Sequence, residues 1–174
     1  MEETVKELQG EKIDRTQPTI VDINVTAYIP DEWVGSSEQK MIEYKRLADV
    51  KSVTELDYIV DEWKDRFAKP PEPVENLIKL IRLRLGATEI KIGVIRETQD
   101  NIRIYTPYSQ AEWNLVARTL PSNISRKIKF TIAPKTCTEG KSVLIVNTSY
   151  VNFDEIFNIL NDLFYYIRKV SYEY

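Results

Sequence analysis

Histidine is absent from this chain of 174 residues, and cysteine occurs once, at Cys137. Because histidine is the commonest metal ligand and general base, its absence removes the residue on which many hydrolytic and metal sites are built. A single thiol forms no internal disulfide and leaves a thiolate metal cluster without its other ligands. We therefore expect a protein that is not an enzyme, with no catalytic residue, no metal and no cofactor.

Long apolar runs are also missing. No stretch approaches the roughly 18–20 residues needed to cross a bilayer, and the acidic start MEETVKELQGEK lacks the basic and apolar regions of a signal peptide. We therefore expect a cytoplasmic protein that does not contact a membrane. The net charge of −3 argues against a general phosphate-binding surface, while a local basic patch stays open.

The composition that is present, 43% hydrophobic and 29% charged, is typical of a globular domain, and the length suffices to bury a core. In residues 1–19 a short helical pattern is broken by Gly10 and Pro18, so we interpret this segment as a leader or the remnant of something larger. Residues 20–174 are then expected to form one domain.

Three helices are predicted in the first half of the chain. Residues 36–50 open with two candidate capping serines, and residues 52–68 open with Ser52 and with Glu55 three positions on, as in a capping box. A third helix begins near Pro73 and runs to Gly86. The expected apolar stripes are Met41, Ile42, Tyr44, Leu47 and Ala48; then Leu56, Ile59, Val60, Trp63 and Phe67; then Leu77, Ile78, Leu80, Ile81, Leu83 and Leu85.

The second half alternates in the manner of strands. Residues 20–29 already read as a half-buried strand, and after Gly86 four more strands and two helices are expected. The strands are residues 89–98 and 101–107, which form a hairpin, and residues 127–134 and 141–149; the helices are residues 109–121 and 153–170. The fold class is α+β: an N-terminal helical part packed against a small, mostly antiparallel sheet with a C-terminal amphipathic helix.

Three groups of residues invite a chemical interpretation. TEGKS, residues 138–142, resembles the end of a phosphate-binding loop, but Lys135 stands where the motif requires glycine and a strand follows, so a hairpin turn is expected. Asp61, Glu62 and Asp65 have no neighbouring base or nucleophile, and a solvated helix face is the ordinary interpretation. The scattered basic residues Lys45, Arg46, Lys79, Arg82 and Arg84 are expected to pair with nearby acids rather than to bind nucleic acid.

Three stretches, AYIPDEWV, EQKMIEYKRL and ELDYIVDEWKDRFAKPPEPVENLIKLIRLRL, resemble in order and spacing the C-terminal domain of bacterial transcription-repair coupling factor (Mfd). The specific motifs cover residues 22–92, and the order of elements extends the likeness to about Phe164. The family usually has glycine after Asp-Arg-Phe, where this chain has Ala68. If that position needs a positive φ, alanine costs on the order of 1 kcal/mol.

The resemblance implies a function. The whole factor is a translocase that binds RNA polymerase and DNA, removes stalled polymerase and recruits UvrA through a UvrB-like N-terminal module. Its C-terminal domain follows the motor domain, so residues 1–19 would be the remnant of that connection. The domain itself is implied to be non-catalytic and autoinhibitory: it docks on the UvrB-like module and masks the UvrA-binding surface until polymerase is engaged.

The resemblance also suggests a site. Trp63 and Phe67 continue the apolar stripe and are assigned to the core, whereas Glu62 and Asp65 share the adjoining stripe. We expect the two carboxylates to accept hydrogen bonds from arginines on the UvrB-like module, with Arg66 as a rim contact. Two alternatives stay open: an accessory domain that contacts DNA and assists the motor, and, least favoured, an enzyme.

Overall fold

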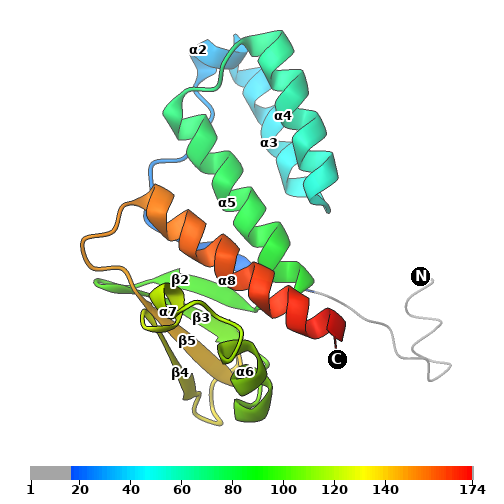
Figure 1. The fold of residues 1–174 in the computed structure, drawn as a ribbon. Helices are drawn as coiled ribbons and strands as arrows, with labels where there is room; N and C mark the ends of the chain where they lie inside the picture. Colours follow the sequence, from blue (N-terminus) through cyan, green and yellow to red (C-terminus); the bar gives the residue numbers. More distant parts are fainter. Residues whose placement is uncertain (1–16, 174) are drawn as a thin grey trace, which may run out of the picture.

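The structure, a computed structural model, describes residues 17–173. A short strand comes first, then a group of helices, and then a group of strands and helices (Figure 1). Their bounds are β1 Ile20–Asp22, α2 Asp31–Val34, α3 Ser37–Asp49, α4 Val53–Phe67, α5 Glu72–Glu89, β2 Val94–Glu97, β3 Asn101–Thr106, α6 Gln110–Ala117, α7 Ser122–Ser125, β4 Ile128–Ile132, β5 Ser142–Asn147 and α8 Phe153–Glu173. The predicted fold class, α+β with a mostly antiparallel sheet and a C-terminal helix, is confirmed.

The five strands form one sheet in the order β1-β2-β3-β5-β4. Only β1 runs parallel to its neighbour; the other pairs are antiparallel, and β2 and β3 form the predicted hairpin. TEGKS lies in the connection from β4 to β5, and Ser142 is the first residue of β5, which confirms the hairpin rather than a phosphate-binding loop.

The predicted strand over residues 20–29 is too long, because only Ile20–Asp22 pair in the sheet. Beyond Asp22 the backbone N–H of Asn24 donates to the side chain of Glu97, the last residue of β2, and not to a strand carbonyl. Burial still alternates as far as Ile29, which explains why the sequence pattern resembles a longer strand.

Helices α3 and α4 begin where the capping serines predict. Ser36 accepts a hydrogen bond from the backbone N–H of Gln39, and Ser52 accepts one from Glu55. Ser109 and Glu112 form a complete capping box at the start of α6. Each cap satisfies a backbone N–H that the first helical turn leaves without a partner.

Helix α5 does not end at Gly86, as its glycine suggested, but continues to Glu89. It is the element that joins the two parts of the molecule: one side of it packs with α4, and another with α8 and β1 (Figure 1). A Cβ placed on Gly86 would lie 3.6 Å from Cδ2 of Phe164 in α8, so the two helices approach closely at this position.

The apolar side chains form two separate cores. The larger lies between the sheet and the helices α5, α6 and α8; the smaller lies among α2, α3, α4 and the first half of α5. The apolar period of residues 153–170 predicts that six side chains face inward, and all six contact the larger core: Phe153, Ile156, Phe157, Leu160, Phe164 and Ile167. Leu163 and Val170 also belong to this core. The helical part therefore has a core of its own and reaches the sheet mainly through α5.

The interpretation of residues 1–19 as a leader falls almost entirely on residues 1–16, which lie outside the described part of the chain. Of the remaining three residues, Thr19 is buried. Its backbone N–H donates to the side chain of Thr88, and its hydroxyl donates to the carbonyl oxygen of Ile92.

Candidate partner-docking site

The three stretches that carry the family resemblance meet in the smaller core. Trp33 of α2 packs edge-on against Trp63 of α4, with ring centroids 5.5 Å apart, and lies 5.3 Å from the ring of Phe67. Trp63 is fully buried and Phe67 is partly buried, so their assignment to the core is confirmed. This aromatic contact fixes the C-terminal end of α4, where the predicted site residues lie.

The predicted face of α3 is partly wrong. Met41 and Ile42 are 65% and 53% exposed, and Ala48 is also exposed. The side of α3 that meets α4 carries Glu43 instead, whose side chain has no exposed surface. A buried carboxylate is stable only where its oxygens receive strong hydrogen bonds.

Glu43 has such partners on both oxygens. Its Oε1 accepts from the indole Nε1 of Trp63 and from Nη1 of Arg46, each at 2.8 Å. Its Oε2 accepts from the side-chain amide of Gln39 at 2.6 Å and lies 3.6 Å from Nη1 of Arg66. Sequence reasoning missed Glu43 because its partners are distributed over two helices and are identified only by their packing.

Glu62 lies on the same network, at the solvent side, with its side chain one-third exposed. Its Oε2 accepts a hydrogen bond from Arg46 and another, at 3.3 Å, from Arg66. The hydrogen bond from Arg46 lowers the pKa of the Glu62 carboxyl, and Arg66 acts in the same direction. We name Glu43, Arg46, Glu62, Trp63 and Arg66 the α3–α4 cluster.

The three predicted site residues do lie at one edge of α4. Asp65 is exposed, and its side chain makes no hydrogen bond or ion pair with any described residue. Arg66 is 46% exposed, and its guanidinium lies 4.8 Å from the ring centroid of Phe67. Glu62 is therefore engaged within the domain, whereas Asp65 is an open carboxylate beside it.

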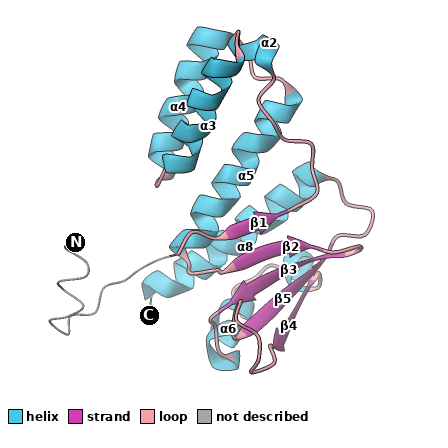
Figure 2. Cartoon of the chain, turned by 180° about the vertical axis from the view of Figure 1, so that it is seen from behind, coloured by secondary structure: helices cyan, strands magenta, loops and turns pink. Residues whose placement is uncertain are grey.

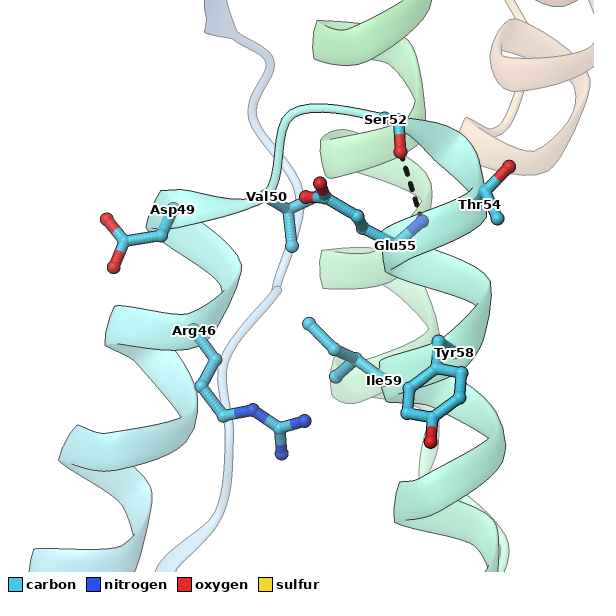
Figure 3. A pocket seen from close by; sticks show the side chains of 8 residues that line it. All are labelled: Arg46, Asp49, Val50, Ser52, Thr54, Glu55, Tyr58 and Ile59. Carbon is cyan, nitrogen blue, oxygen red and sulfur yellow. Dashed lines mark hydrogen bonds between the residues drawn. The ribbon is translucent and has the colours of Figure 1, made fainter.

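A surface groove runs beside this cluster, between the end of α3 and the start of α4 (Figure 3). It has a volume of about 530 Å³, and its lining includes Arg46, Glu55, Tyr58 and Ile59. Figure 3 shows the Arg46 side chain extending from α3 toward α4, and the capping bond of Ser52 at the rim. Tyr58 is 74% exposed, so the groove adds an aromatic ring to the charged surface.

The acidic group Asp61, Glu62 and Asp65 is not part of a metal-binding constellation in the structure. Among residues 17–173 no group of three or more cysteine, aspartate or glutamate side chains is arranged to hold a metal ion. Over the same residues, no helix combines the length and the apolar character that a membrane span requires.

Four of the five basic residues that were considered as contacts to nucleic acid have a hydrogen-bond or ion-pair partner within the domain. Arg46 pairs with Glu43 and Glu62, Lys79 with Asp154, and Arg82 with Asp57. Arg84 donates to the carbonyl oxygen of Leu47. The expected pairing with nearby acids is thus found for three of the five, Arg46, Lys79 and Arg82.

The fold and the site together define a small two-part α+β domain whose distinctive feature is a charged cluster on a helix pair. The family model that matches the chain is the TRCF domain, over residues 23–114, more than half of the sequence. The chain belongs to this family, that of the C-terminal domain of transcription-repair coupling factor, Mfd.

Curated relatives and a solved structure agree with this assignment. The chain is 29% identical over 105 residues to the transcription-repair-coupling factor of Bacillus subtilis and 31% identical over 106 residues to that of Staphylococcus epidermidis, in each case 60% of this chain and 9% of the relative. The crystal structure of a C-terminal domain of transcription-repair coupling factor has the same fold, with a TM-score of 0.70 and 17% identity over 91% of this chain and 98% of that one. The chain thus spans about a tenth of the length of these curated relatives, and the alignments do not include a motor region.

Proposed function

We propose that this chain is a non-catalytic, autoinhibitory docking domain that binds the UvrB-like module of a transcription-repair coupling factor and covers its UvrA-binding surface until the factor engages stalled RNA polymerase. The observation that carries the proposal is the charged edge of α4. Glu62 and Asp65 lie there side by side on a helix end that aromatic packing holds in place. No cofactor is required for this role.

The hydrogen bonding leaves room for a partner's arginine. Both internal bonds to Glu62 use Oε2, and no described residue donates to its Oε1. A carboxylate has about four acceptor positions, so an incoming guanidinium can bind Oε1 of Glu62 and the open carboxylate of Asp65 together. Arg66 lies at the rim, where it can meet an acidic or aromatic group of the partner.

The α3–α4 cluster prepares this surface for binding. Glu43 is buried and holds Arg46 and, at a longer distance, Arg66. Those two arginines in turn orient Glu62. Because the carboxylate is already fixed, less side-chain entropy is lost when a partner binds.

A small contact of this kind suffices inside one polypeptide. A tethered domain experiences an effective concentration of its partner that reaches roughly millimolar values. The free 174-residue chain is therefore expected to bind the UvrB-like module weakly, and a weak contact is easy to release when the domains of the factor move.

A titration of the purified UvrB-like module with this chain tests the docking surface. Asp65→Arg reverses the open carboxylate, and the loss of one member of a desolvated charged pair typically costs about 2–5 kcal/mol, so the Kd should rise at least roughly 30-fold. Asp162→Arg makes the same charge change on the exposed surface of α8 and serves as the control. Equal affinities of the two variants would place the interface elsewhere.

A further inference from the structure

Within residues 17–173 no helix packs on one face of the sheet, although the connection between β4 and β5 covers the end of that face where Val94 and Val143 are buried. The core side carries Ile95, Ile102, Ile104, Leu144 and Val146, on which α5, α6 and α8 pack. Figure 2 looks onto the opposite face, with the strands in front of α6 and α8. Because successive strand residues point to opposite faces, this second face is formed by the residues between the core positions.

The register places a basic row across this open face. Arg96 of β2 lies opposite Arg103 of β3, Arg103 lies opposite Ile145 of β5, and Ile145 lies opposite Lys129 of β4. Neighbouring strands are about 4.8 Å apart, so Arg103 and Lys129 are separated by about 10 Å at the backbone. The one acidic residue in register with this row is Asp22 of β1, at the far edge beside Arg96.

Most of the basic side chains on and beside this face have no hydrogen-bond or ion-pair partner among the described residues. The side chains of Arg103, Arg126, Lys127 and Lys129 make no hydrogen bond or ion pair with other residues in the described range. Arg96 differs, because it pairs with Glu139 at 2.9 Å and lies over the ring of Tyr105.

The free cations surround a hollow in the same face. A cavity of about 420 Å³ is lined by Arg126, Lys127 and Lys129, and its other lining residues include Asp100, Asn101 and Asn147. Three cations thus face a single carboxylate, and the amide side chains add hydrogen-bond donors. Such a surface favours an extended anion over an apolar ligand.

We propose that this open sheet face binds the phosphate backbone of duplex DNA, with Arg103, Arg126, Lys127 and Lys129 as the contacting residues. A row about 10 Å long reaches about two neighbouring phosphates of one strand, which are separated by about 3.4 Å along the helix axis and by more through space. Arg126 and Lys127 beside the row can reach two more, which makes about four contacts. Binding of single strands normally relies on exposed rings that stack on bases. Tyr105, in the row next to the cations, is half-buried beneath Arg96 and offers no free face for stacking. Tyr150, which follows Ser149 at the rim of the hollow, is exposed, so the comparison of duplex with single strand tests directly whether bases stack there.

This surface is independent of the docking site proposed above. It lies on the sheet, which belongs to the larger core, whereas Glu62 and Asp65 lie on α4 in the smaller one. The domain can therefore dock through its helices while its sheet contacts DNA, and loss of one activity leaves the other intact.

The test is fluorescence anisotropy of a labelled 20-base-pair duplex titrated with the whole chain at 50 mM and 200 mM salt. With about four phosphate contacts, the logarithm of the association constant should fall with the logarithm of salt with a slope of about −3.6, which is roughly a 150-fold loss over this range. Absence of binding at 50 mM salt, or tighter binding of the matching single strand, would overturn the proposal.

Two charge-matched variants localise the contact. Arg103→Ala with Arg126→Ala, Lys127→Ala and Lys129→Ala should reduce duplex binding to background. The control removes four exposed cations outside the sheet, Lys45, Lys51, Lys64 and Lys69, each changed to alanine, and should retain at least half of the affinity. Equal losses in both variants would contradict a specific face, as would tighter binding of polyglutamate than of DNA. If the fourfold variant melts early, Arg103→Ala with Lys129→Ala should still lower the salt slope by about 2.

Discussion

At the scale of single residues, Glu43 decides whether the α3–α4 cluster forms. Replacing it by alanine leaves the buried indole N–H of Trp63 without its acceptor and removes one of the two carboxylates that hold Arg46. A buried donor left without an acceptor typically costs about 1–3 kcal/mol. We expect Glu43→Ala to lower the free energy of unfolding by this amount in urea titrations.

The exposed neighbour Glu38, also on α3, provides the comparison. Glu38→Ala should change the stability by less than about 1 kcal/mol, because it removes only a favourable charge in the first helical turn. A Glu43→Ala variant as stable as Glu38→Ala would contradict the structural role of the buried carboxylate.

Ala68 carries backbone strain. The residue has φ 78° and ψ −173°, a region populated almost only by glycine, and conformations of this kind cost about 1–3 kcal/mol. The positive φ considered from the sequence is therefore present. Ala68→Gly should stabilise the domain by about 1 kcal/mol, measured as an upward shift of Tm, whereas destabilisation would show that the strain is relieved in another way.

The titration of Glu62 makes the stability of the domain depend on pH. Its pKa in the folded state is lowered from the ordinary value of 4.5, so its stabilising contribution is fully present above that pH and is lost as the pH falls through the lowered pKa. The stability difference between wild type and Glu62→Gln should thus be larger at pH 7 than at pH 3.

The same comparison, repeated in a variant that lacks Arg46, identifies the cause of that pH dependence. Arg46→Met removes the guanidinium that contributes most to lowering the pKa of Glu62. In the Arg46→Met variant, the change in stability caused by Glu62→Gln should vary less with pH. An unchanged pH profile would mean that Arg46 does not set the pKa.

At the scale of elements, α5 shows how packing overrides a local signal. Gly86 suggested a helix end, yet the helix continues through it to Glu89 and packs there against Phe164 of α8. The 3.6 Å separation from a built Cβ is ordinary van der Waals contact. Gly86→Ala should therefore stabilise the helix by about 0.5–1 kcal/mol in thermal unfolding, whereas Gly86→Leu should destabilise it.

Elements with local signals were predictable from the sequence. The serine caps at Ser36, Ser52 and Ser109 act within a few residues of the chain, and the strand alternation that sets β2, β3 and β5 is equally local. The four-residue helices α2 and α7 were missed because they are too short to show a helical period.

The face of α3 could not be predicted for a different reason. Apolar periodicity favours burial of Met41 and Ile42, but the helix turns Glu43 inward. That orientation depends on Trp63 and on two arginines supplied by separate positions on α3 and α4. The energetic balance of a buried polar network is a property of the packed helix pair, so hydrophobicity along one helix does not reveal it.

At the scale of the whole molecule, two cores are connected by α5. The order of helices and strands was evident from the sequence, but the separation into two clusters depends on which side of each helix faces which neighbour. The arrangement has a functional consequence: the α4 edge and the open sheet face belong to different cores, so each can contact its own partner.

The measurement that tests the central claim most directly is UvrA binding to the UvrB-like module in the presence and absence of this chain. The account predicts that wild-type chain, at concentrations above its own Kd, weakens UvrA binding in proportion to its occupancy of the module, and that Asp65→Arg does not. A ternary complex in which UvrA binds the module with unchanged affinity while the chain stays bound would contradict the account.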